Sequence, residues 1–165
     1  MYFENEGEIM ADKFLTVRGY EQRLYGDKLL TGSMEDYVEM IYRYTIEGEE
    51  YIRLNKLADL LNVRDSSASK MMQKLGSIGL IDYEKYGIIK LTALGREIGQ
   101  YLLNRHNIIE VFLKFICDDE DVLIETELIE HILGNETVEN IKIFNEFIEK
   151  NKDFKMEYRK FREKK

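Results

Sequence analysis

The chain has 165 residues, of which 44% are hydrophobic and 34% are charged, and its formal net charge is −8. That length is enough for one compact core, or for two small cores that share a helix, and it excludes a large multidomain enzyme. The sequence contains no proline, so nothing interrupts long helices and we expect a mainly α-helical protein. No apolar stretch is long enough to span a bilayer, and the acidic N-terminus does not resemble a secretory signal. We therefore expect a cytoplasmic protein with no membrane partner.

The charge is distributed unevenly along the chain. Residues 53–105 carry 9 basic and 5 acidic side chains, whereas residues 1–52 and 106–150 have net charges of −7 and −9. Residues 151–165 are basic again, with a net charge of +4. A basic segment between two acidic ones is expected of a polyanion-binding module beside a cation-binding module. Chance clustering of solvated charges would give the same totals.

The N-terminal part of the chain predicts an extension followed by two helices. Residues 1–30 show little clean periodicity and form an extension of unknown role. Apolar residues spaced by three and four predict a helix from Met34 to about Gly48, with Ser33 as its N-cap. A second, short helix follows at about residues 54–61.

The next segment predicts a third helix and a β-hairpin. The helix is capped by Asp65 or Ser66 and ends at Gly79. Two β-type runs, at residues 80–84 and 88–91, read as the strands of a hairpin. Helix, short helix, turn, helix and hairpin is the order of a winged helix-turn-helix DNA-binding domain.

The C-terminal part predicts only helices. A long helix extends from about Ala93 to Ile116, and residues 118–121 interrupt the pattern. Further helices are predicted at residues 122–133, 136–150 and 153–164. In the last of these, three aromatic residues at helical spacing predict that one face of the basic tail packs against the protein.

The third helix and the hairpin carry the candidate DNA contacts. The outer face of the helix combines small hydroxyls, which let a helix approach base edges, with cations that contact phosphates or guanine. The hairpin adds two lysines and a tyrosine, which suits a wing lying along the sugar-phosphate backbone. A generic polar helix face, or a winged helix that binds protein, would show the same pattern. The candidate residues are Arg64, Ser66, Ser67, Ser69, Lys70, Lys74, Lys85, Tyr86 and Lys90.

Both histidines of the chain lie beside carboxylates at helical spacing. Each group alone is explained by a packed histidine or by solvated helix charges. Together, two imidazoles and four or more carboxylates suit one or two octahedral ions of the manganese or iron type. A structural zinc site is not expected, because Cys117 is the only cysteine. The groups are Glu127, Glu130 and His131; His106 with Glu110; and Asp36 with Glu39.

Five separated segments, covering about residues 31–150, carry a family resemblance. They are Ser33-Met-Glu-Asp-Tyr-Val-Glu39, Asp65-Ser-Ser-Ala-Ser-Lys-Met71, Tyr83-Glu-Lys-Tyr-Gly87, Asn104-Arg-His106 and Ile129-Glu-His131. In this order they resemble the diphtheria toxin repressor family of metal-dependent transcriptional regulators, and within it the manganese transport regulator branch. The resemblance implies a winged helix at residues 31–92, then a linking helix and a helical metal-binding and dimerisation domain at residues 93–165. Longer family members carry a third, SH3-like domain, which we do not expect here.

The resemblance also implies a site for two neighbouring metal ions. The iron-sensing branch has methionine at the position of Asp36 and cysteine at that of Glu127. Hard oxygen ligands at both positions favour Mn²⁺, with Fe²⁺ as the alternative. By the same implication, Glu127 and Glu130 touch both ions, Asp36 and His131 touch one, and Glu39 and His106 touch the other.

We therefore expect a manganese-responsive repressor, not an enzyme, that binds double-stranded operator DNA as a homodimer and uses no organic cofactor. Three alternatives remain: an iron(II)-responsive repressor, a metal-independent winged-helix regulator, and a di-metal carboxylate enzyme. Such enzymes typically repeat Glu-x-x-His on two helices, a motif that neither histidine here occupies. Cys117 has no partner motif and is expected to be a small buried residue.

Overall fold

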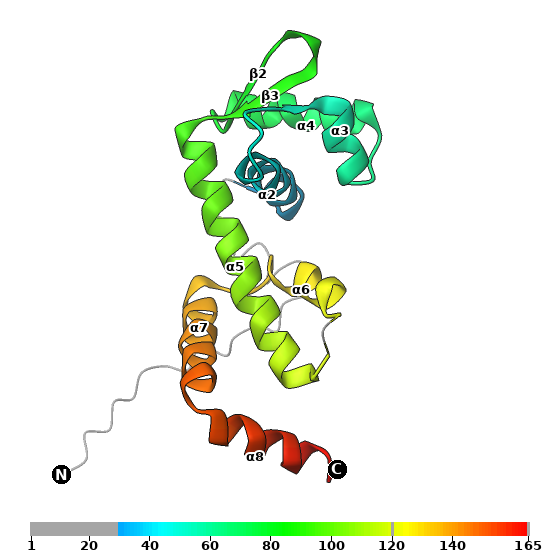
Figure 1. Ribbon diagram of the computed structural model, residues 1–165. Helices are drawn as coiled ribbons and strands as arrows, with labels where there is room; N and C mark the ends of the chain where they lie inside the picture. The colour runs from blue at the N-terminus through cyan, green and yellow to red at the C-terminus, as the bar shows by residue number, and fades with distance from the viewer. Residues whose placement is uncertain (1–29, 120, 165) are drawn as a thin grey trace, which may run out of the picture.

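The computed structural model describes residues 30–119 and 121–164, so the predicted extension lies outside the described residues except for Leu30. The long helix α5 runs between a winged-helix end and a helical end (Figure 1). In chain order the described elements are α2 (Gly32–Ile46), β1 (Ile52–Arg53), α3 (Leu54–Leu60), α4 (Asp65–Ser77), β2 (Ile81–Tyr83), the 3-10 turn η1 (Lys85–Gly87), β3 (Ile88–Leu91), α5 (Ala93–Cys117), α6 (Leu123–Ile129), α7 (Asn135–Lys150) and α8 (Lys152–Arg162).

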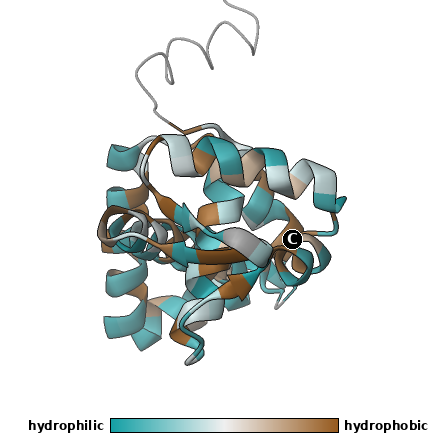
Figure 2. Ribbon diagram, turned by 90° about the horizontal axis from the view of Figure 1, so that it is seen from above, coloured by the Kyte–Doolittle hydropathy of each residue, from teal (hydrophilic) through white to brown (hydrophobic). Residues whose placement is uncertain are grey.

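A first core forms between α2, α3, α4 and a small sheet. The sheet is antiparallel, in the order β1-β3-β2, and Ile52 of β1 lies opposite Ile89 of β3. Hydrophobic and hydrophilic positions alternate along the surrounding helices, as amphipathic packing requires (Figure 2). Strand β1 was not predicted, because a two-residue strand leaves no period in the sequence. The fully buried side chains of this core include Val38, Ile41, Leu57, Met72, Leu75 and Ile89.

A second, smaller core forms around the C-terminal half of α5. Leu102 of α5 belongs to the first core, whereas Ile109, two turns later, belongs to the second. The rings of Phe115 and Tyr158 lie 4.9 Å apart, and those of Phe147 and Phe154 lie 5.4 Å apart, so α8 contacts α5 and α7 through aromatic rings although none of its residues is buried. Within the described ranges, no helix combines the length and the apolar character needed to cross a bilayer.

Two glycines allow α5 to approach its neighbours closely. A Cβ added at Gly95 would lie 2.0 Å from the carbonyl oxygen of Leu80, and one at Gly99 would lie 2.5 Å from Cβ of Tyr42. Both distances are far below van der Waals contact. Tyr42 is on α2, so Gly99 lets the backbones of α2 and α5 lie side by side, which matters for the site described below.

Several predicted helix ends are wrong. The N-cap of α2 is Thr31, not Ser33: the Thr31 hydroxyl accepts a hydrogen bond from the amide of Met34. The N-cap of α4 is Arg64, without a side-chain hydrogen bond, so neither Asp65 nor Ser66 caps it. The sequence alone does not show which of several adjacent polar residues is the N-cap, because the N-cap is the last residue with non-helical backbone angles before the helix begins.

Two predictions in the C-terminal half also need correction. Helix α6 ends at Ile129, well short of residue 133, because the amide of Ile132 turns to bond the carbonyl of Ile129 three residues back. Cys117 is exposed, not buried. It is the last residue of α5, and the left-handed Asp118 follows it, so its side chain lies where the helix leaves the core.

Candidate metal centre and DNA-binding surface

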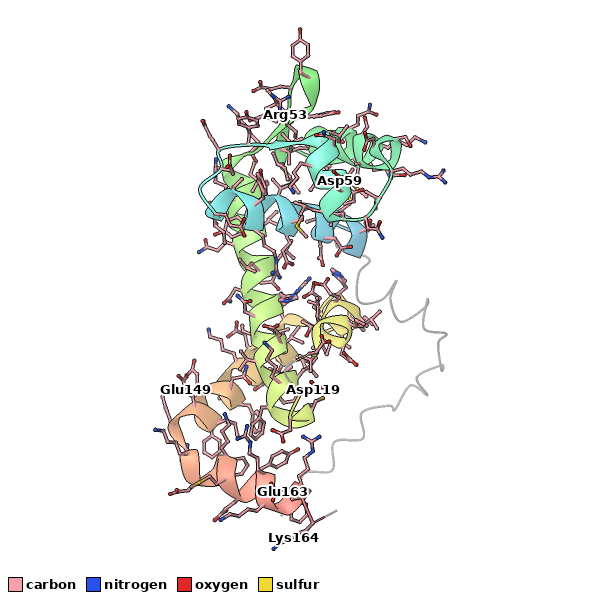
Figure 3. The ribbon with its side chains drawn as sticks, turned by 45° about the vertical axis from the view of Figure 1, so that its right-hand side comes forward. Arg53, Asp59, Asp119, Glu149, Glu163 and Lys164 are labelled. Atoms are coloured by element: carbon pink, nitrogen blue, oxygen red, sulfur yellow. The ribbon has the colours of Figure 1, made fainter. Side chains whose placement is uncertain are left out.

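The carboxylate and histidine residues singled out in the sequence converge between α2, α5 and the end of α6. Asp36 and Glu39 lie on α2, His106 on α5, Glu127 on α6, and Glu130 and His131 directly after it. Asp36, Glu127, Glu130 and His131 each offer a ligand atom within 4.8 Å of the others. Figure 3 shows side chains filling the space between these elements, midway between the labelled Asp59 and Asp119. Glu110, in contrast, pairs with Lys114 at 3.2 Å and is not part of the cluster.

The carboxylate of Glu130 lies between the two histidines. Its Oε2 is 2.8 Å from Nδ1 of His106, and its Oε1 is 3.6 Å from Nε2 of His131. The side chain is almost completely buried, with 1% exposed. One carboxylate therefore faces two separate imidazoles with different oxygens, which is the arrangement of a ligand shared between two neighbouring sites.

The remaining ligand candidates divide between the two histidines. On one side, Nε2 of His131 lies 2.8 Å from Oδ1 of Asp36. On the other, Nδ1 of His106 lies 4.0 Å from Oε1 of Glu39 and 3.7 Å from Oε1 of Glu127. Glu127 also belongs to the group around His131. The family resemblance implies the same division, which remains a prediction.

The electrostatics of the cluster favour positive charge. Hydrogen bonds to Asp36 and Glu35 raise the pKa of His131 to about 10, although burial opposes them. Burial also lowers the pKa of His106, but the hydrogen bond to Glu130 and its charge outweigh burial, so that pKa lies above its usual value. Burial and the charge of Glu130 raise the pKa of Glu127. In the absence of a metal ion, the carboxylates thus stabilise the protonated form of each ring.

The donor set of this cluster fits a hard divalent cation. It consists of four carboxylates and two imidazoles, with no thiol or thioether among the candidate ligands. Carboxylate and imidazole donors suit Mn²⁺ and Fe²⁺, whereas structural zinc sites are built mainly from cysteine and histidine.

A buried ion pair beside the cluster was not predicted. Oε2 of Glu35 accepts a hydrogen bond from Nη2 of Arg105 at 2.7 Å, and it lies 2.9 Å from Nδ1 of His131. The side chains of Glu35 and Arg105 are 7% and 3% exposed. A signal was present in the sequence: both residues fall on the apolar stripes of their helices, three residues from Val38 and Leu102.

Glu39 forms an ion pair with Arg43 on the same helix. Its Oε1 accepts hydrogen bonds from Nε and Nη2 of Arg43, at 2.9 and 2.6 Å. Arg43 is one turn further along α2 and is partly exposed. This pair holds the Glu39 carboxylate in place next to His106.

The candidate DNA contacts lie on the outer face of α4 and on the wing. Arg64, Ser66, Ser67, Lys70 and Lys74 are exposed, and Ser69 and Lys90 are half-buried. The opposite face of α4 is fully buried in the first core. Tyr86, in the turn between β2 and β3, is 89% exposed. Lys85 begins that turn, and Lys90 lies 3.9 Å from the exposed Glu50. Most of the candidate side chains on α4, together with Tyr86, are therefore accessible to a partner.

Family comparison places these two regions in known domains. Residues 29–89 match the family model for the N-terminal DNA-binding domain of the iron dependent repressor, and residues 92–157 match the model for its metal-binding and dimerisation domain. The chain belongs to the iron dependent repressor family. The resemblance inferred from the five sequence segments is thereby confirmed, as is the fold class of a winged helix followed by a helical dimerisation domain.

Individual members of the iron dependent repressor family are similar over most of their length. The HTH-type transcriptional regulator MntR of Oceanobacillus iheyensis is 43% identical over 67% of this chain and 76% of its own. MntR of Bacillus velezensis is 37% identical over 82% of this chain and 96% of its own. A solved manganese-dependent transcriptional repressor in complex with manganese is 27% identical, with a TM-score of 0.63, over 69% of this chain. The chain matches only 53% of the length of that repressor.

Proposed function

We propose that this chain is a manganese-responsive transcriptional repressor that binds operator DNA as a homodimer in the cytoplasm, and that it is not an enzyme. The position of Glu130, with one oxygen toward each histidine, carries the proposal. Membership of the iron dependent repressor family supports repression, and the similarity to MntR and to a manganese-dependent repressor supports the choice of metal.

The proposed ligands form two sites that share two residues. A divalent cation would supply the positive charge that holds the clustered carboxylates together. The half-exposed Glu127 leaves the cluster open to solvent on one side, which gives an ion a route in. Glu127 and Glu130 would serve both sites, Asp36 and His131 one, and Glu39 and His106 the other.

The proposed site joins the two domains, which we place at residues 31–92 and 93–165. Asp36 and Glu39 are on α2, and α2 shares its core with the DNA-reading helix α4. Glu130 and His131 follow α6, in the second domain. Shared ligation would hold α2 against the second domain and thereby fix the position of α4. In a dimer this sets the spacing of two recognition helices and lowers the entropic cost of docking in successive major grooves.

An exposed apolar stripe supports the homodimer. Ile124, Leu128 and Ile132 follow one another at intervals of four residues and are 71%, 66% and 53% exposed. Contiguous apolar surface of this kind marks an interaction site, and a symmetric dimer buries the same patch on both subunits. The stripe lies on α6 and the turn after it, next to the proposed ligands.

The proposal assigns the outer face of α4 and the wing to DNA. Ser69 and Lys70 lie in the first two turns of α4, where a recognition helix meets base edges. Lys74, one turn later, and the wing residues Lys85, Tyr86 and Lys90 would lie along the phosphates. Arg64, Ser66 and Ser67 surround the N-terminus of α4, where phosphate contacts are also favoured.

Metal titration with DNA tests the function. An operator is first selected from a random duplex library with the Mn²⁺-loaded protein, and binding is then measured by fluorescence anisotropy with chelator, Mn²⁺, Zn²⁺ and, anaerobically, Fe²⁺. We expect tight, sequence-specific binding with Mn²⁺ and weak binding with chelator. Equal binding with chelator would show a metal-independent regulator, and stronger activation by Fe²⁺ would show an iron sensor.

A further inference from the structure

Both ring nitrogens of His131 are held by consecutive residues of α2. Nε2 faces Asp36 at 2.8 Å, and Nδ1 faces Glu35 at 2.9 Å. The ring also lies against the start of the same helix, because a Cβ added at Gly32 would be 3.3 Å from its Cγ. The first turn of α2 therefore contacts the ring at both nitrogens and at its ring carbons.

The two carboxylates differ in their surroundings. Asp36 belongs to the group of four candidate ligands, and its side chain is 39% exposed. Glu35 lies outside that group, is buried, and shares its Oε2 between His131 and the buried guanidinium of Arg105. The Glu35–Arg105 pair neutralises itself, so Glu35 adds no net charge to the cluster.

We propose that Glu35, held in place by Arg105, is a positioning residue that accepts the Nδ1 proton of His131 and so leaves Nε2 as the ligand atom. A neutral imidazole carries one proton, which stays on the nitrogen that has a hydrogen-bond acceptor. Both nitrogens face a carboxylate, but Asp36 is itself a proposed ligand, so Glu35 is the acceptor left for the proton when an ion is bound. Metal-ligating histidines commonly use a carboxylate in this way, which fixes the ring and raises its basicity. The inference rests on the proposed metal site at His131.

The arrangement has a counterpart in the sequence. Glu35 precedes the proposed ligand Asp36, and Arg105 precedes the proposed ligand His106. The ion pair therefore ties α2 to α5 immediately beside one ligand on each helix. Arg105 also keeps Glu35 from turning toward the ions, since leaving a buried guanidinium unpaired would be costly.

The test uses the full chain, with Glu35→Gln and with the double variant Glu35→Gln/Arg105→Met. Glu35→Gln alone leaves the buried Arg105 without a charged partner and could therefore unfold the protein. The double variant removes both charges, so it keeps the test possible if the single variant does not fold. Glu97→Gln, at an exposed position of α5, is the matched control for charge. Circular dichroism and size exclusion establish fold and oligomeric state before any metal is added.

Two measurements are made on each protein. Mn²⁺ affinity is obtained from the electron paramagnetic resonance signal of the free ion. The proton on Nδ1 is observed by long-range ¹H–¹⁵N correlation of ¹⁵N-histidine-labelled protein loaded with diamagnetic Zn²⁺. With only two histidines in the chain, each ring is assigned by comparison with a His106→Gln variant.

We expect the wild type and Glu97→Gln to show a protected Nδ1 proton on His131. Both Glu35 variants should lose that protection and bind Mn²⁺ about 10–100-fold more weakly. Folded variants that keep the protected proton, or that bind Mn²⁺ within about threefold of the wild type, would overturn the role of Glu35 while the metal site stands. Failure of the wild type to bind Mn²⁺ would instead refute the proposed function itself.

Discussion

Oε2 of Glu130 and Nδ1 of His106 lie 2.8 Å apart in the interior, although 24 residues separate them in the sequence. Nothing in the spacing of either residue requires this contact. It arises because α6 and the turn after it fold back against α5, and it places a buried carboxylate where both histidines can use it. The strongest expectations for mutagenesis follow from this contact.

Replacing Glu130 by Gln should strongly weaken the response to manganese. The amide keeps the shape of the side chain but removes the negative charge that cations need, at a position that we propose serves two ions. We expect at least about a tenfold loss of Mn²⁺-stimulated operator binding in a folded, dimeric protein. Anisotropy titration checks this, with the exposed Glu136→Gln as control. Full Mn²⁺ stimulation in Glu130→Gln would show that the Glu130 carboxylate is not a ligand shared by the two ions.

Asp36→Met should change the choice of metal. A neutral thioether replaces a hard anionic oxygen, so Mn²⁺ should lose more affinity than Fe²⁺. Activation of DNA binding by the two ions is compared anaerobically in wild type and variant. A variant that loses Mn²⁺ and Fe²⁺ responses equally would show that Asp36 contributes charge but not selectivity.

Manganese binding should weaken as the pH falls. The pKa of His131 is raised to about 10 by its hydrogen bonds to Asp36 and Glu35, and that of His106 is raised as well. His131 is therefore protonated at neutral pH and must lose one proton before its nitrogen can bind a cation, and the raised pKa of His106 makes its ring compete with the cation in the same direction. We expect release of at least about one proton per chain near pH 7, and a corresponding loss of affinity toward pH 6. Calorimetry in buffers of different ionisation enthalpy counts the protons; a value near zero would contradict the proposed histidine ligands.

Lys70 and Lys74 should differ in how they affect DNA binding. Lys70→Ala should cost about 1–3 kcal/mol on the operator and much less on scrambled duplex, because it removes a base contact. Lys74→Ala should weaken both complexes similarly and reduce their salt dependence, because it removes a phosphate contact. Salt titrations on both duplexes at saturating Mn²⁺ make the comparison. Equal losses of affinity for Lys70→Ala on the two duplexes would show that Lys70 contacts the DNA backbone and not a base.

Gly99→Ala should damage the metal site from a distance. The added Cβ would meet Cβ of Tyr42 at 2.5 Å, so α2 must move away from α5. We expect destabilisation of about 1–3 kcal/mol, together with weaker Mn²⁺ binding, because Asp36 and Glu39 move with α2. Thermal unfolding and Mn²⁺ titration are measured side by side, and Gly134→Ala, where nothing lies within 4 Å of the added Cβ, serves as control. Unchanged Mn²⁺ affinity in a destabilised Gly99→Ala would show that the site tolerates movement of α2.

Local patterns in the sequence were enough to identify every α-helix that the structure describes and the main strands, and to single out most of the candidate ligands. The apolar stripe of α4 and its polar outer face are spaced by the helix period, so both could be recognised without knowledge of their neighbours. The same spacing rule grouped Glu127, Glu130 and His131, although α6 ends at Ile129 and the last two residues follow it. The family motifs connected these residues to Asp36, Glu39 and His106.

Other features depended on the tertiary structure, because they depend on contacts between distant segments. The sharing of Glu130 between two histidines needs α5 and the end of α6 in contact, and the Glu35–Arg105 pair needs α2 against α5. The N-cap at Thr31 and the early end of α6 depend on hydrogen bonds that several adjacent residues could make equally well. A periodic pattern specifies which face of a helix is buried, but it does not specify which other helix will cover that face. Only packing, here through the close approach at Gly99, decides which charges meet inside the protein.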